Sequence, residues 1–318
     1  MTEEVNLYRI KLIRWNWEKE DDPNTKDDYR DYCIKNNLLA CGWPARVKCK
    51  TFNEYKDNVE KMFHNPKEFK KLSFLEQEKV KQEKPYDNHS SWATVCNAMN
   101  RDMKAGDLCW TQGKDGKYYL GKIKDKEIYF NCPNHPQIGI YKEVEEWKGF
   151  ELDAIPGDVI RSLIGGKTLQ QIKSVTIKRY SENLYNGKKQ KNLERIEDLL
   201  HPDDLEDLLG LYLQKEKKYF VFPSTNKTGT ACYEYMLVNK AGKKAIIQCK
   251  TGNSDIDDTQ SLIKERKNIT VYITTLAENK KYPGAIVVPF KTLTEWASKE
   301  ENMKVLPDRI KNYLEWSK

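Results

Sequence analysis

The chain has 318 residues, of which 55 are Lys or Arg and 48 are Asp or Glu, so its formal net charge is +7 at pH 7. This length suffices for two domains that each bury a core, and the mild positive charge suits a polyanionic partner. No run of 18 or more apolar residues occurs, and residues 1–4 lack the character of a signal peptide, so we expect a soluble, cytoplasmic protein without membrane spans.

The N-terminal half predicts a mixture of strands and helices. Alternating polarity indicates a strand, and apolar residues at helical spacing indicate a helix. On this basis we expect strands at residues 7–17 and 38–43, and helices at residues 27–36, 53–63 and 69–82. The second strand ends in a Gly42-Trp43 turn.

A short helix and a strand pair follow. Residues 90–100 have a helical pattern, and Ser90 or Ser91 can serve as its N-cap. Residues 106–110 and 117–123 are rich in residues typical of strands, and the segment between them holds two glycines. We therefore predict an antiparallel pair joined by a turn at residues 112–116.

Three motifs in this half resemble the PUA-like β-barrels of the EVE and YTH group. They are Gly42-Trp43, then Gly106-Asp107-Leu108-Cys109-Trp110, then Tyr118-Tyr119-Leu120-Gly121-Lys122-Ile123, with residues 155–160 and 165–169 as the end of the module. The resemblance covers residues 1–172 and implies an α+β domain with a β-barrel. Domains of this group present an aromatic-lined pocket, which in several families takes a modified base.

Such a pocket requires flat aromatic walls and a few polar groups that match the edge of the base. Trp92 is the preferred wall because it follows two small polar residues at a predicted helix start. The full set of candidates is Trp43, Trp92, Trp110 and Tyr118 for walls, and Ser90, Ser91 and Asp107 for hydrogen bonds. The alternative is that the tryptophans belong to the core and that Asp107 holds the turn before its strand.

Residues 173–199 predict a basic linker. Lys188, Lys189 and Lys191 form a cluster after Gly187. One interpretation is a solvated linker, and the other is a segment that contacts the phosphates of duplex DNA.

The C-terminal third, residues 200–318, predicts a helix, a strand and a hairpin. Residues 204–214 have helical spacing after Pro202, and residues 219–224 form a short buried strand. Two further strand-like runs, residues 233–238 and 245–249, flank a three-residue loop that ends in Gly242. The C-terminal stretch adds a strand at residues 271–274, another at 283–290 and a helical tail.

The predicted hairpin brings three polar groups together. A loop centred on Ala241 pairs Glu234 directly with Gln248, and Lys250 lies on the same face two residues further on. A carboxylate and an amide oxygen suit Mg²⁺ beside a phosphate, and a lysine can orient or deprotonate water or neutralise charge on the phosphate. The alternative is an ordinary amphipathic hairpin with polar residues outside.

The order of these elements resembles the PD-(D/E)XK nuclease fold, most closely the Mrr-type branch in which glutamine replaces the second acid. The resemblance implies an α/β domain with a central mixed sheet flanked by helices. It implies Glu234 as metal ligand, Gln248 at the second-acid position, Lys250 as the catalytic lysine and Glu206 as an assisting helix acid. The first acid of this family is usually Asp, and Glu234 departs from that pattern.

Two classes of function follow. In the first, the protein is a Mg²⁺-dependent endonuclease that reads a modified base in DNA through residues 1–172 and cuts through residues 200–318, with a homodimer for double-strand cleavage. In the second, it binds DNA or RNA without cutting, and the nuclease fold is degenerate.

The cysteines indicate a reducing compartment. Eight of them are scattered along the chain without a CxxC pair, and several lie in strand-like runs, where buried thiols are common. Cys132 and His135 have the spacing of zinc ligands, but a zinc site would need two more ligands. We therefore expect free thiols.

Overall fold

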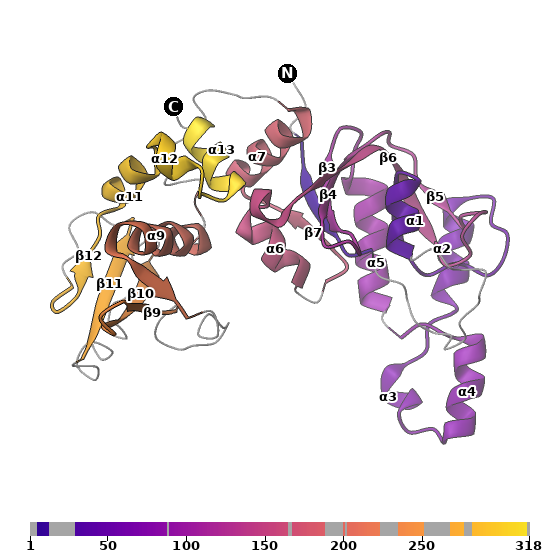
Figure 1. Cartoon of the computed structure of the whole chain (residues 1–318). Coiled ribbons are helices and arrows are strands. Elements are labelled where there is room, and N and C mark those ends of the chain that lie inside the picture. Colours follow the sequence, from indigo (N-terminus) through magenta and orange to yellow (C-terminus); the bar gives the residue numbers. More distant parts are fainter. Residues whose placement is uncertain are drawn as a thin grey trace. The chain divides into compact units, whose positions relative to one another are not determined.

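A computed structural model of the chain divides into two compact units (Figure 1). The structure describes residues 5–12, 29–87, 89–164, 167–187, 200, 202–222, 235–250, 268–276 and 282–316. The first unit consists of Met1–Ile155 and Val159–Lys188, and the second of Pro156–Asp158 and Lys189–Lys318.

The first unit is built on a seven-stranded sheet that curls as a half-barrel. Its strands are β1 (Leu7–Ile10), β2 (Leu38–Cys41), β3 (Leu108–Gln112), β4 (Tyr118–Ile123), β5 (Tyr129–Phe130), β6 (Ile140–Phe150) and β7 (Leu169–Ile172). They follow the order β2-β6-β4-β3-β1-β7, with β5 paired to β6. Only the β1–β3 pair is parallel among these pairings. The predicted antiparallel pair at residues 106–123 is confirmed as β3 and β4.

The first unit also contains several helices and short helical turns. They are α1 (Tyr29–Lys35), α2 (Phe52–Glu60), α3 (Pro66–Phe69), α4 (Phe74–Glu83), α5 (His89–Asn97), the π-helical turn η1 (Ala98–Asp102), the 3₁₀ turn η2 (Leu152–Ala154), α6 (Gly157–Ile164) and α7 (Val175–Asn186). The single helix predicted at residues 69–82 is wrong, because the chain turns at residues 70–73 between α3 and α4.

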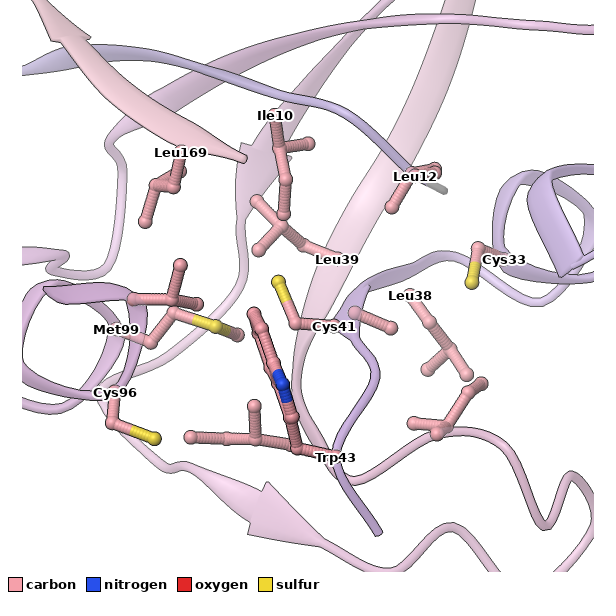
Figure 2. Packing of buried hydrophobic residues seen from close by; sticks show 14 of the residues in the cluster. Ile10, Leu12, Cys33, Leu38, Leu39, Cys41, Trp43, Cys96, Met99 and Leu169 are labelled. Atoms are coloured by element: carbon pink, nitrogen blue, oxygen red, sulfur yellow. The ribbon is translucent and has the colours of Figure 1, made fainter. Parts of the chain in front are cut away.

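Two apolar clusters fill the first unit. One contains Tyr8, Ile10 and Cys109 with residues of α1, α2 and α5, and Figure 2 shows Trp43 packed between Cys41 and Met99 in this cluster. The other contains Leu7 and Trp110 with residues of α6 and α7. Neighbouring residues of β1 thus belong to different clusters, as expected for a strand whose successive side chains point to opposite faces. The sheet is therefore covered on both sides.

The segment after β7 belongs to the first unit. The indole Nε1 of Trp110 donates a hydrogen bond to Ser181 Oγ at 2.9 Å, and the Tyr180 hydroxyl donates to the carbonyl oxygen of Ala154 at 2.7 Å. Ser181 and Tyr180 both belong to α7. The predicted linker at residues 173–199 is therefore wrong for residues 175–186, because an apolar stripe of α7 packs on the sheet. Residues 188–199 lie outside the described part of the chain.

The second unit contains a mixed five-stranded sheet. Its strands are β8 (Tyr219–Val221), β9 (Met236–Asn239), β10 (Lys244–Lys250), β11 (Ile269–Thr275) and β12 (Ile286–Val287), in the order β12-β11-β10-β9-β8. The pairs β10–β11 and β11–β12 are parallel, and β8–β9 and β9–β10 are antiparallel. The strand predicted at residues 283–290 is reduced to Ile286–Val287.

The helices of this unit are α9 (Pro202–Lys217), α11 (Phe290–Ala297), α12 (Glu300–Met303) and α13 (Asp308–Trp316). An ion-pair network ties α13 to the start of α9. Arg309 Nε lies 2.5 Å from Asp204 Oδ1, and its Nη2 pairs with Asp207. Asp204 is fully buried, and a buried carboxylate requires such a partner.

Candidate functional site

The hairpin formed by β9 and β10 has the predicted register. Lys244 pairs with Val238, Ala245 with Leu237 and Ile246 with Met236, so every pair is centred on Ala241. Asn239 Oδ1 accepts hydrogen bonds from the backbone N–H groups of Ala241 and Lys243, both at 3.0 Å. Gly242 has φ of 74°, the left-handed conformation predicted for the last loop position. The loop chemistry therefore fixes the register of the hairpin.

The same register continues toward the candidate site. The N–H of Ile247 donates to the carbonyl oxygen of Tyr235 at 3.3 Å, and the N–H of Asn239 donates to that of Lys243 at 3.0 Å. These two pairs are hydrogen-bonded pairs of an antiparallel ladder. Pair types alternate along such a ladder, so Met236–Ile246 and Val238–Lys244 are of the non-hydrogen-bonded type, in which side chains approach most closely.

Glu234 lies outside the described residues. If the ladder continued one step further, Glu234 would face Gln248 in a non-hydrogen-bonded pair, a type in which the Cα atoms are about 4.5 Å apart. Lys250 is the last residue of β10, and its backbone is in register with Thr275 of β11. Its side chain is not described. The described ladder, on which the predicted triad depends, therefore extends to Tyr235, the residue that directly follows Glu234.

Gln248 is a buried amide in an apolar region of the sheet. Its exposed fraction is 4%, and it lies in register with Ile273 of β11. Ile246, two residues earlier on the same face, packs in a cluster with Val271 and Ile273. Burying an amide costs free energy unless its polar atoms are satisfied, so a glutamine at this position requires polar partners.

Gln248 and Lys250 stand at the carboxyl end of β10. Because β11 is parallel to β10, its carboxyl end, Thr274 and Thr275, lies at the same edge of the sheet. In open sheets with parallel strands, ligands bind outside the carboxyl ends of those strands. The strand topology and the positions of the polar residues therefore both indicate this edge of the sheet as the candidate ligand-binding site.

Glu206 is not brought to this face. It belongs to α9, and its carbonyl oxygen accepts a hydrogen bond from the Tyr235 hydroxyl at 2.8 Å. Tyr235 pairs with Ile247, so its side chain points to the face opposite to that of Gln248. The helix therefore covers the other side of the sheet, and the geometry gives Glu206 no place beside Gln248.

The donor set can be tested against Mg²⁺ by its chemistry. The described residues contain no group of three or more His, Cys, Asp or Glu side chains that could hold a metal. Mg²⁺ needs less from the protein, because it keeps several waters and binds through one or two oxygen ligands plus a substrate phosphate. A carboxylate at Glu234 and the amide oxygen of Gln248 would fit that requirement.

The predicted aromatic walls of the first unit lie in its core. Trp92 has an exposed fraction of 0%, and its ring contacts those of Phe63 and His89 at centroid distances of 5.5 and 5.3 Å. Trp43, Trp110 and Tyr118 are also buried. Trp110 Nε1 is already bonded to Ser181. The structure thus favours the core alternative, and none of the four is an open wall.

The polar candidates near these aromatics have other positions. Helix α5 begins at His89, so Ser90 and Ser91 lie within its first turn and are not N-caps. Asp107 is buried, and its carboxylate accepts from the backbone N–H groups of Asn6 and Lys104, each at 2.8 Å. The interpretation that Asp107 holds the turn before its strand is therefore confirmed. The phosphate-binding candidates Lys188, Lys189 and Lys191 lie outside the described residues.

The cysteines of the first unit are free thiols, and all of them except the partly buried Cys49 are buried. Burial raises the pKa of Cys96 to about 12, so this thiol stays protonated at neutral pH and is a poor metal ligand. Cys132 and His135 are both buried, and His135 packs against the rings of Tyr29 and Tyr32. Within the described ranges no further ligands complete a zinc site around them.

One exposed feature was not singled out by the sequence patterns. Phe74 and Leu75 open α4 and are 75% and 74% exposed. Burying each would contribute roughly 1.5–3 kcal/mol, so two adjacent exposed apolar side chains are unusual. The signal in the sequence is an apolar pair directly after a helix-capping serine, Ser73.

Comparison with protein-family models, with curated proteins and with solved structures gives no match. In the part of the chain that the structure describes, no helix has the length and apolar character needed to cross a bilayer.

Proposed function

We propose that the protein is a Mg²⁺-dependent DNA endonuclease whose active site lies at the carboxyl end of β10. The observation that carries this proposal is the register of the β9–β10 hairpin, which continues to Tyr235–Ile247 and, one step further, would bring Glu234 opposite Gln248. The burial of Gln248 and the parallel β10–β11 pair support the same location. The resemblance of residues 200–318 to the PD-(D/E)XK fold supplies the type of reaction.

Each residue has a role in this proposal. Glu234 and Gln248 would hold Mg²⁺ through a carboxylate and an amide oxygen, and the ion would supply positive charge at the scissile phosphate. Lys250 would orient the attacking water and neutralise the charge that develops on the phosphate. Water would attack phosphorus, and the bond to the leaving oxygen would break. Glu206 is left out, because α9 covers the opposite face.

The first unit would recognise the DNA. This part of the proposal rests on the resemblance of residues 1–172 to PUA-like domains, and the target is DNA that carries a modified base or is foreign to the cell. Because Trp43, Trp92, Trp110 and Tyr118 are core residues, contacts to a base would come from other side chains. Cleavage of both strands would require two copies of the site, as in a homodimer.

The test is cleavage of plasmid and phage DNAs that differ in base modification, with Mg²⁺ or with EDTA. We expect nicking or cleavage with Mg²⁺ only, and a loss of about 10²–10³-fold in rate for Lys250→Ala, as for other groups that stabilise a developing charge. Lys244→Ala is the matched control, because Lys244 is an exposed lysine on the same face and at the other end of the same strand. Its rate should equal that of the wild type.

The second candidate is a protein that binds nucleic acid without cutting it. The feature that favours it is Glu234 in the position where the family usually has Asp. Equal DNA binding by the wild type and Lys250→Ala, with no cleavage of any DNA or structured RNA by either, would establish this second function and reject the first.

A further inference from the structure

Helices α3 and α4 form an arm that stands away from the rest of the first unit (Figure 1). Neither helix has a buried residue. Isolated helices shorter than about 12–15 residues are marginal in water, and α4 has only ten residues. The arm is therefore held by local bonds and by its base, and not by a core of its own.

The base of the arm is closed by paired backbone segments. The N–H of His64 donates to the carbonyl oxygen of Tyr86 at 2.9 Å, and the N–H of Tyr86 donates to that of Met62 at 3.2 Å. His64 Nδ1 lies 2.7 Å from the carbonyl oxygen of Lys84, and Arg46 Nη1 donates to that of Gln82 at 2.6 Å. Both ends of the arm are thus fixed to the unit.

The far end of the arm is equally defined. The backbone N–H and the hydroxyl of Ser73 both bond to Glu76 Oε2, at 2.8 and 2.6 Å, and these bonds lower the pKa of Glu76. They fix the first turn of α4, where Phe74 and Leu75 project into solvent. A fixed turn presents the two apolar side chains in one orientation.

Three lysines lie shortly before this apolar pair in the sequence. Lys67, Lys70 and Lys71 precede it on α3 and the connecting turn, and all three are exposed. In the described part of the chain none of them lies within 4 Å of a carboxylate. The tip therefore combines apolar side chains with unneutralised positive charge.

We propose that this arm is a DNA-binding wedge, in which Phe74 and Leu75 enter between stacked base pairs while Lys67, Lys70 and Lys71 contact the adjacent phosphates. A duplex offers apolar base faces bordered by negative charge, which complements the tip in both respects. Inserted Phe and Leu side chains unstack a base step in proteins that bend DNA. The inference rests on the proposed function, because it assumes that DNA is the partner.

The test uses a labelled duplex that contains 2-aminopurine, whose fluorescence rises on unstacking, with the full-length protein in EDTA. We expect the wild type to bind and to raise the fluorescence. The variant Phe74→Ala/Leu75→Ala should bind about tenfold more weakly, the worth of one lost stacking contact, and should abolish the rise. Ile164→Ala removes an apolar side chain that is 77% exposed elsewhere in this unit, and it should leave both signals unchanged.

A second variant tests the lysines independently. Lys67→Gln/Lys70→Gln/Lys71→Gln should reduce the slope of log K against log [salt] by about 2–3, since each phosphate contact contributes about 0.9. Lys299→Gln/Lys304→Gln, two exposed lysines of the second unit, should leave the slope unchanged. All substituted side chains are exposed, so the urea midpoint should not move in any variant.

The outcomes separate this inference from the proposed function. If both arm variants bind the duplex, raise the fluorescence and depend on salt as the wild type does, the wedge is overturned, even if the plasmid is cleaved. Binding to anionic phospholipid vesicles that depends on Phe74, without binding to the duplex, would also overturn it. Loss of the fluorescence rise in the arm variant would support the wedge, even if no DNA is cut and the catalytic proposal fails.

Discussion

The two units place their candidate residues at different points of their sheets. In the first unit, the predicted base-binding aromatics are interior, and Trp92 contacts Phe63 and His89 within the core. In the second unit, Gln248 and Lys250 stand at the end of a strand, beside the end of a parallel neighbour. An aromatic residue in a strand-rich domain is explained by apolar packing, whereas a buried amide at a strand end requires polar partners.

The largest effect that this comparison predicts is on the stability of the first unit. Trp92→Ala removes a fully buried indole, and we expect it to lower the free energy of unfolding by about 3–5 kcal/mol, measured by urea titration. Trp92→Phe should lose much less, because it keeps an aromatic ring in the same site. If the Trp92→Ala protein keeps wild-type stability and selectively loses binding to modified DNA, Trp92 is a wall of a base-binding pocket and not a core residue.

A smaller effect is expected at the turn before β3. Asp107→Ala leaves the N–H groups of Asn6 and Lys104 without their carboxylate partner, and we expect a loss of about 1–3 kcal/mol in the free energy of unfolding. Asp107→Asn keeps one acceptor oxygen and should fall between the wild type and the alanine variant. Unchanged stability in Asp107→Ala, together with weaker DNA binding, would contradict the structural role.

The smallest effect is expected in the hairpin loop of the second unit. Gly242→Ala places a Cβ in a left-handed conformation, where it meets no atom within 4 Å, so only the backbone cost of about 1 kcal/mol applies. Hydrogen exchange of the amides of residues 245–247 should then be about fivefold faster. Gly242→Asn should exchange more slowly than Gly242→Ala, because Asn tolerates this conformation. Equal exchange in all three proteins would mean that the loop does not set the register.

Local patterns in the sequence predicted the local structure of both units. The β3–β4 pair and the β9–β10 register followed from turn residues, because a turn constrains only its own neighbours. The sequence predicts a linker where α7 lies, because the lysines that follow this helix mask an apolar stripe that includes Ile177 and Tyr180. Turn residues carry no information about which face of a sheet a helix covers.

In the candidate site, too, the features set by local turns could be predicted from the sequence and those set by tertiary packing could not. The register of the β9–β10 hairpin, from which the Glu234–Gln248 pair is proposed, depends on a three-residue loop and could be predicted. The place of Glu206 depends on how α9 packs, and the burial of Trp92 depends on contacts with Phe63, far away in sequence. Such tertiary contacts leave no short-range signal, so these two assignments required the structure.

The central claim is that Glu234 stands directly opposite Gln248, and cross-linking tests it most directly. In Glu234→Cys/Gln248→Cys, a non-hydrogen-bonded pair brings the Cα atoms to about 4.5 Å, within the range of a disulfide. We expect mild oxidation to give a 234–248 disulfide by peptide mass spectrometry, and Glu234→Cys/Lys250→Cys to give none. A cross-link in the second variant and not in the first would mean that the strands are shifted and that the triad does not form.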